Sequence, residues 1–172
     1  MLQRISPQDF EAVYEILFDS FPKNELRPRD IMKRTMENEK YIVYKFGEGE
    51  SITGVTAVWE LDGFLFIEYL AVNAKERNKG SGSHILHELC RLYNCPLCLE
   101  VEPPESDITK RRIEFYRRNG FYLNSYPYEQ PAYSETQSAV PLMIMTSHSV
   151  ITEEQFIKMR KEIYKEVYNK II

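Results

Sequence analysis

An apolar strand that leads through a glycine-containing turn into a helix lies between Phe64 and Ser83, and it narrows the possible folds more than any other segment. Residues 64–72 are apolar on both faces except for Glu68, which is typical of a central strand covered on both sides. Apolar residues then recur on one helical face up to Tyr93, and a short strand follows at Leu97–Val101. We therefore expect a strand, a crossover helix and a parallel strand, which indicates an α/β chain.

The flanking segments predict a mixed sheet of about six or seven strands with helices on both of its faces. The expected elements are a capped helix from Ser6-Pro7, a helix at about 29–37, a hairpin of strands 41–46 and 52–59, a helix at 108–119, strands at 121–123 and 140–145, and an amphipathic helix at about 152–169. Between Asn124 and Ala139 we expect a polar loop that contains tyrosines.

Length and charge exclude several classes of protein. At 172 residues and 43% hydrophobic content, the chain is expected to form a single domain over residues 1–172. No stretch approaches the roughly 18 apolar residues that a membrane span requires, and a net charge of -4 gives no general attraction to nucleic acid or anionic lipid. We expect a cytoplasmic protein, a monomer or homodimer, without nucleic-acid or membrane partners.

The cysteines do not indicate a disulfide or a metal site. Cys90, Cys95 and Cys98 are an odd number of thiols, which argues against a disulfide framework. Cys95 and Cys98 have the spacing of a redox motif, but they follow a helix and open a strand, which is the reverse of the usual context. Zinc would need a fourth ligand, and His87 is the only nearby candidate, so we expect no metal.

The residues between the central strand and its helix form a turn suited to an anion. This glycine turn consists of Arg77, Asn78, Lys79, Gly80, Ser81, Gly82 and Ser83. Its glycines allow close approach of the backbone, and successive amides at a helix start would converge on a phosphate. Neither a Walker motif nor the dinucleotide G-x-G-x-x-G is present. The alternative is that the turn is only a tight connection.

A second motif lies one strand and one helix downstream, at Phe115-Tyr116-Arg117-Arg118-Asn119-Gly120-Phe121. With the apolar strand and the glycine turn, it completes an ordered pattern over residues 64–123. In this pattern the chain resembles the GNAT superfamily of N-acetyltransferases. The resemblance implies a GNAT-like fold with a cofactor-binding core at about 64–123, whose sheet is splayed at the central parallel pair.

The resemblance also implies the cosubstrate and several roles. Acetyl-CoA would bind in the splay, with the pyrophosphate on the glycine turn and the pantetheine on the backbone of Leu70, Ala71 and Val72. Tyr116 matches the family tyrosine that protonates the departing thiolate, and its alternative role is that of a core tyrosine. The family often has an asparagine and an alanine where this chain has Thr109 and Arg112, so these two side chains are expected to contact pantetheine and a phosphate instead.

An acceptor amine must lose a proton before it attacks the thioester, so a base is needed. Glu68 is the first candidate, because a half-buried carboxylate is a stronger base than an exposed one. The alternative is a structural glutamate paired with a basic side chain or neighbouring strands. Glu100 and Glu102 alternate along the next strand, and either can be the base or bind a cationic acceptor.

Family analogy places the acceptor near two loops, Phe21–Arg29 and Tyr126–Tyr133. Glu25, Tyr126 and Tyr128 are the candidate substrate residues there. The predicted activity is direct acetyl transfer from acetyl-CoA to a primary amine of a small molecule or peptide. The alternatives are a longer acyl donor and a module that binds coenzyme A without turnover.

Overall fold

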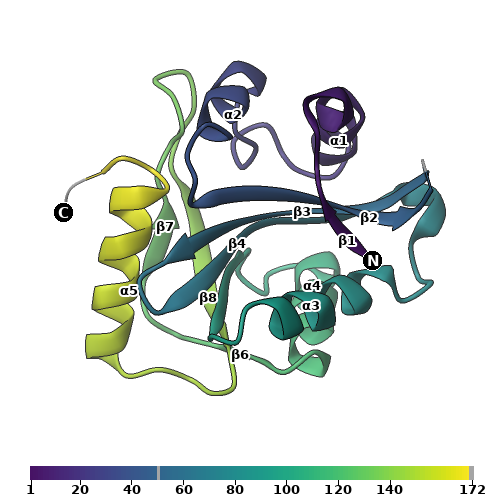
Figure 1. The fold of residues 1–172 in the computed structure, drawn as a ribbon. Helices are drawn as coiled ribbons and strands as arrows, with labels where there is room; N and C mark the ends of the chain where they lie inside the picture. The colour runs from purple at the N-terminus through teal and green to yellow at the C-terminus, as the bar shows by residue number, and fades with distance from the viewer. Residues whose placement is uncertain (50, 171–172) are drawn as a thin grey trace. The chain divides into compact units, whose positions relative to one another are not determined.

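A computed structural model describes residues 1–49 and 51–170, and its contacts separate into two compact units. The first unit contains Met1–Glu60 and Ile67–Asn94, and the second contains Leu61–Phe66 and the chain from Cys95 onwards. The strands form an open mixed sheet flanked by helices, which confirms the predicted α/β class (Figure 1). The prediction of a single domain stays a prediction.

The first unit contains the strand order β1-β2-β3-β4. These strands are β1 (Leu2–Arg4), β2 (Tyr41–Glu48), β3 (Ser51–Leu61) and β4 (Phe64–Val72), of which β4 begins in the second unit. β2 pairs antiparallel with β1 and β3, and a register shift occurs between Phe46 and Gly47. A side chain at Gly47 would lie 1.9 Å from the Ser51 carbonyl oxygen, so this irregular hairpin requires glycine. The sequence analysis missed β1, which is too short to show an alternating pattern.

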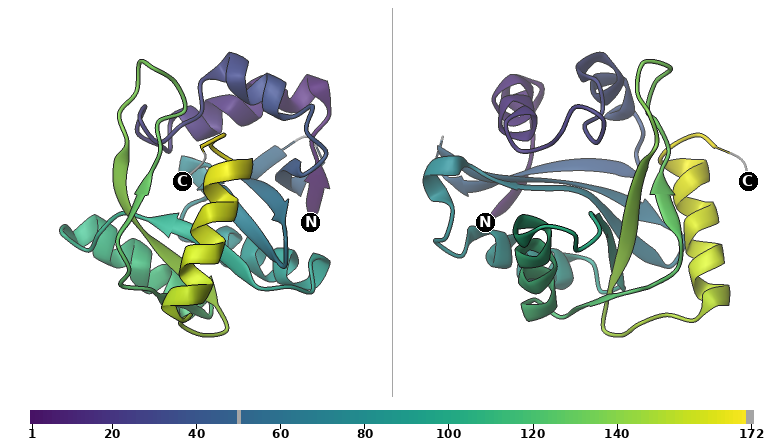
Figure 2. Two further views of the ribbon diagram at one scale, coloured as in Figure 1. Left: turned by 90° about the vertical axis from the view of Figure 1, so that its left-hand side faces the viewer. Right: turned by 180° about the vertical axis from the view of Figure 1, so that it is seen from behind.

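Two helices cover one face of these strands and a third covers the other (Figures 1 and 2). α1 (Phe10–Phe18) follows a 3-10 turn at Pro7–Asp9, and α2 is Arg29–Thr35. α3 (Ser81–Leu92) begins directly after the glycine turn and buries Ile85, Leu86 and Leu89. The apolar stripe predicted for this helix is therefore its core face.

The second unit is organised around β8 (Val140–Ser147), which pairs antiparallel with three strands. They are β5 (Leu97–Val101), β6 (Phe121–Leu123) and β7 (Tyr128–Gln130). The segment that contains β7 was predicted to be a loop, and pairing with β8 makes its centre a strand. The start of β4 also lies here: the Leu65 amide donates to the Pro96 carbonyl over 2.9 Å, and β4 runs parallel to β5.

Two helices complete the second unit. α4 (Asp107–Arg118) contacts β5 and β6, and α5 (Glu153–Glu166) lies beside β7 and β8 (Figure 2). A capping box opens α5, in which Thr152 and Gln155 exchange side-chain to backbone hydrogen bonds. The Tyr164 hydroxyl donates to the Glu129 carbonyl over 2.6 Å, which ties α5 to β7. No helix in residues 1–49 and 51–170 has both the length and the apolar character that crossing a bilayer requires.

Candidate functional site

The glycine turn presents its backbone amides at the start of α3. Gly80 is the N-cap residue, with a φ of 87°, and Asn78 also has a positive φ, of 65°. These left-handed conformations curl the chain just before the helix begins. Across the described chain, the amides of residues 77–83 make no hydrogen bond to another protein group. The turn therefore has main-chain donors available to a ligand at the positive end of a helix dipole.

Side chains around the turn hold it against the end of β4. The Asn73 amide donates to the Thr53 carbonyl over 2.9 Å, and the Asn73 side chain accepts from the Lys75 amide. Arg77 is exposed, and its Nε donates to the Val72 carbonyl over 3.4 Å. Lys79 forms an exposed ion pair with Glu76. Arg77 thus keeps its Nη donors available beside the amides, whereas the charge of Lys79 already has a partner.

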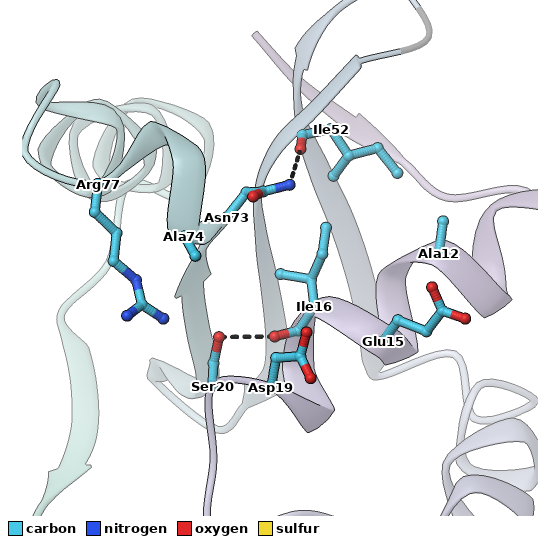
Figure 3. A pocket seen from close by; sticks show the side chains of 9 residues that line it. All are labelled: Ala12, Glu15, Ile16, Asp19, Ser20, Ile52, Asn73, Ala74 and Arg77. Atoms are coloured by element: carbon cyan, nitrogen blue, oxygen red, sulfur yellow. Dashed lines mark hydrogen bonds between the residues drawn. The ribbon is translucent and has the colours of Figure 1, made fainter.

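A cavity of about 500 Å³ adjoins this turn (Figure 3). Its lining comes from α1 and the residues that follow it, from the start of β3 and from the segment after β4: Ala12, Glu15, Ile16, Asp19, Ser20, Ile52, Asn73, Ala74 and Arg77. Ser20 donates to the Ile16 carbonyl over 2.7 Å and Asn73 donates to the Ile52 carbonyl over 3.4 Å, so both are fixed in place. Two carboxylates, Glu15 and Asp19, therefore face the same cavity as the Arg77 guanidinium.

The end of β4 packs closely against β3. The Thr56 hydroxyl donates to the Tyr69 carbonyl over 2.9 Å. A Cβ at Gly54 would lie 3.1 Å from the Ala71 carbonyl oxygen and 2.7 Å from Ile85, so only glycine fits there without displacement. Leu70 and Val72 are half-buried and Ala71 is buried. The backbone proposed to bind pantetheine is thus rigidly supported on its β3 side.

Glu68 forms a buried ion pair that the sequence analysis did not identify. Its Oε1 accepts from Nη2 of Arg27 at 2.7 Å and from Nε at 3.2 Å, while Oε2 accepts from Trp59 Nε1 at 3.2 Å. The two charged side chains are only 5% and 1% exposed. A basic partner is the contact that the sequence analysis gave as the alternative to a catalytic base.

Arg27 is also held through its backbone. Its amide donates to the Tyr69 hydroxyl over 2.8 Å, and its carbonyl accepts from the Tyr14 hydroxyl. The Tyr69 hydroxyl donates to the Glu25 carbonyl over 3.2 Å, so Glu25 is fixed by its main chain. These bonds anchor the loop between α1 and α2 on β4. No local pattern singles out Arg27, because Glu68 and Tyr69 lie 41 and 42 positions away.

In the second unit, Tyr116 lies on the buried face of α4. Its ring makes edge-on contacts with Phe115 and Phe121, at centroid separations of 5.1 and 5.8 Å. Within the described residues its hydroxyl makes no hydrogen bond. Burial raises the pKa of Tyr116 to about 12, and Arg112 opposes the change. The phenol therefore stays protonated at neutral pH, as a proton donor must.

The two residues that depart from the family pattern are engaged elsewhere in the second unit. Thr109 forms a capping box with Ser106 at the start of α4, in which its hydroxyl donates to the Ser106 carbonyl over 3.0 Å. Arg112 forms an ion pair with Glu102. To contact a cofactor, Thr109 would have to break its hydrogen bonds with Ser106, and Arg112 would have to break its ion pair with Glu102.

Glu100 lies within a cluster of tyrosines. It accepts hydrogen bonds from the hydroxyls of Tyr128 and Tyr168, the latter at 3.0 and 2.9 Å from its two oxygens. Burial, followed by the charge of Glu100, raises the pKa of Tyr128 well above its usual value. Tyr126 is directed elsewhere, because its hydroxyl donates to the Ile151 carbonyl. Of the predicted substrate residues, the structure therefore brings Glu100 and Tyr128 together and leaves Tyr126 apart from them.

Among the described residues, Cys90, Cys95 and Cys98 form no disulfide. Cys98 is buried on β5, and burial raises its pKa well above the usual value, which keeps the thiol protonated. A protonated, buried thiol is a poor nucleophile.

Comparison with known proteins agrees with these features. Residues 10–121 match the model of the acetyltransferase (GNAT) family. "Putative acetyltransferase YjbC" of Bacillus subtilis (strain 168) is 28% identical over 158 residues, which cover 90% of this chain and 80% of that protein.

Solved structures show the same fold. A "Putative acetyltransferase from GNAT family" of Bacteroides thetaiotaomicron has a TM-score of 0.91 and 29% identity, over 99% of both chains. An aminoglycoside 6'-N-acetyltransferase complexed with coenzyme A has a TM-score of 0.62 at 12% identity, over 86% of this chain and 96% of that one, and shows the fold alone. The family model spans well over half of the sequence, and the chain therefore belongs to the GNAT family of acetyltransferases.

Proposed function

We propose that this protein transfers an acetyl group from acetyl-CoA directly to a primary amine of a small molecule or peptide. The observation that carries the proposal is the glycine turn, in which the amides of residues 77–83 make no hydrogen bond within the described chain and lie beside the Arg77 guanidinium. A diphosphate would accept from several of these donors at once.

The cofactor would bind through the turn and the end of β4. The pyrophosphate is assigned to residues 77–83, and the pantetheine amides to the backbone of Leu70, Ala71 and Val72. Support comes from family membership and from the relative that was solved with coenzyme A. The acetyl-CoA is consumed as a cosubstrate and is not a resident group.

The chemistry needs one base and one acid. Glu68 takes a proton from the acceptor ammonium, and the neutral amine then attacks the thioester carbon to form a tetrahedral intermediate. The carbon–sulfur bond breaks as this intermediate collapses, and Tyr116 donates its proton to the departing thiolate. The nitrogen of the intermediate loses its second proton in the same collapse, and that proton restores the Tyr116 phenol. Glu100 and Glu102 are the alternative bases. Each of the three carboxylates is hydrogen-bonded to a neighbour, so contacts alone do not separate them.

Glu25, Tyr126 and Tyr128 remain candidates for contact with the acceptor.

Cofactor binding is tested by thermal melting with and without acetyl-CoA. At a hundredfold excess over the dissociation constant, binding stabilises the folded state by about 2.7 kcal/mol. For a domain of this size that is a rise of about 5–10 °C. The absence of any rise with acetyl-CoA or free coenzyme A would remove the basis of the proposal.

Turnover is tested by following thiol release from acetyl-CoA over a panel of primary amines. Tyr116→Phe should lower kcat by about 10²–10⁴-fold while the acetyl-CoA melting shift stays unchanged. Tyr122→Phe is the matched control, because Tyr122 is an exposed tyrosine near the same helix. Cofactor binding without turnover of any amine would favour the coenzyme A-binding module over the enzyme.

A further inference from the structure

A second cavity, of about 590 Å³, lies within the second unit, between α5 and the turn that joins β3 to β4. Asp62, Gly63 and Phe64 line it from the turn, and Pro96 and Ile151 add apolar surface. Six residues line it from α5: Gln155, Lys158, Met159, Lys161, Glu162 and Lys165. None of these lining residues is assigned to acetyl-CoA or to the acceptor, so the cavity has a role that the proposed function does not explain.

The face of α5 that lines this cavity is separate from the face that α5 packs into its own unit. The packed face buries Phe156, Ile163 and Tyr164. On the cavity face Lys158 is exposed and Met159 is half-buried. An amphipathic helix usually has one apolar face against the core and one polar face in solvent. The polar face of α5 instead adjoins an apolar hollow, which is typical of a surface that receives a partner.

The charges on this face are of both signs, and several have no partner within the chain. Lys165 forms an ion pair with Glu166 over 2.7 Å. Within the described residues, Lys158, Lys161 and Glu162 form no ion pair. A ligand of a single charge would meet a repelling group here as well as an attracting one. A surface that carries the same mixture of charges can satisfy both signs.

The six α5 residues also have an internal symmetry. When the helix is reversed about position 160, Gln155 exchanges with Lys165, Lys158 with Glu162, and Met159 with Lys161. In a two-fold dimer, residue i of one copy meets residue j of the other, and j meets i. Four residues advance a helix by one turn and about 40°, so a two-fold axis between Lys158 and Glu162 would bring each of them opposite the other type. The cavity face is therefore complementary to itself.

We propose that α5 and the cavity beside it bind a second copy of this chain, with the two α5 helices antiparallel. Lys158 faces the partner's Glu162 on both sides of the two-fold axis, and Met159 lies beside the stem of the partner's Lys161. α5 has 14 residues and is about 21 Å long, so the contact is small. A weak, reversible dimer is expected, with a dissociation constant in the micromolar range.

Charge reversal tests the pairing, with sedimentation velocity of the full chain measured between about 1 and 500 µM. Lys158→Glu places a carboxylate opposite the partner's Glu162 at two positions and should weaken the dimer at least about tenfold. Glu162→Lys should have a similar effect. The combined variant restores opposite charges at both positions, so its dissociation constant should return to within about threefold of the unmodified value.

Lys110→Glu is the matched control, because Lys110 is an exposed lysine on α4 that does not line the cavity. It changes the net charge by the same amount and should leave the dimer unchanged. Circular dichroism of each variant checks that α5 is still folded. A monomer at every concentration, equal effects of Lys158→Glu and Lys110→Glu, or a combined variant as weak as the single ones would each overturn the proposal. These outcomes are independent of acetyl transfer, since none of them is read from turnover.

Discussion

The glycine turn and the side chains around Glu68 lie in the same unit of the protein and differ in how their polar groups are satisfied. The turn is exposed at its start, and its main-chain donors make no bond within the described residues. Glu68 is buried and accepts from Arg27 and Trp59. Exposed donors at a helix start are available to a ligand, whereas a satisfied buried pair holds the elements on either side in place. Substitutions should therefore affect binding in the first region and stability in the second.

The largest effect is expected from breaking the buried pair. Glu68→Ala leaves the Arg27 guanidinium without its carboxylate and should lower the free energy of unfolding by about 3–5 kcal/mol, measured by denaturant titration. Acetyl-CoA affinity, compared under conditions in which the variant is folded, should be little changed.

A double variant that removes both charges sharpens this prediction. Arg27→Met with Glu68→Leu should cost less stability than Glu68→Ala alone, because no unpaired charge remains buried. If the double variant is less stable than the single one, the pair contributes more than mutual charge satisfaction.

The next largest effect is expected at the turn. Arg77→Ala removes a charge-assisted donor from the phosphates and should weaken acetyl-CoA binding by about 10- to 100-fold, measured by calorimetry. Lys75→Ala, an exposed cation two positions earlier, is the control and should have a much smaller effect. Equal losses in the two variants would reduce the role of Arg77 to general electrostatic attraction.

Gly80→Ala should have a smaller effect that is divided between stability and binding. At a φ of 87° an alanine costs about 1–2 kcal/mol of folding free energy. Gly63→Ala is a matched control, because Gly63 has a φ of 83° and no atom lies within 4 Å of the position that its Cβ would occupy. Both variants should lose similar stability in denaturant titrations, but only Gly80→Ala should also weaken acetyl-CoA binding. Weakened binding in both would mean that the turn is not a special site.

The smallest expected effect concerns the pH dependence of kcat, to which Tyr116 should contribute nothing in the ordinary assay range. A pKa of about 12 keeps Tyr116 protonated far above neutrality, so the donor form is fully present across ordinary assay conditions. Since activity would be lost only as the pH rises through that value, kcat should show no decline from Tyr116 between about pH 8 and pH 10. A decline in that range that Tyr116→Phe abolishes would show that its pKa in the working enzyme is lower.

Local patterns predicted most of the fold. The helices at 29–35, 81–92, 107–118 and 153–166 lie within a few residues of their expected positions, because an apolar stripe and a capping residue are read within one or two turns of chain. The short strands β1 and β7 were not expected. Each is three residues long and exists through its pairing with a longer strand, which no local pattern encodes.

The candidate site also contains features that a local pattern predicted and features that depend on distant residues. The position of the glycine turn before α3 was predicted from a contiguous motif, and its binding of a phosphate stays a prediction. Arg27 was missed as a partner of Glu68, from which it is separated by 41 positions.

The residues alone were sufficient to indicate the α/β class and the family, because each depends on short-range periodicity or on an ordered motif. Which carboxylate pairs with which cation depends on side chains brought together from distant segments. The same holds for hydrogen bonds: the Tyr168 hydroxyl donates to Glu100, which lies 68 positions away in the sequence. Buried polar groups acquire their partners through packing, and packing is a property of the folded chain.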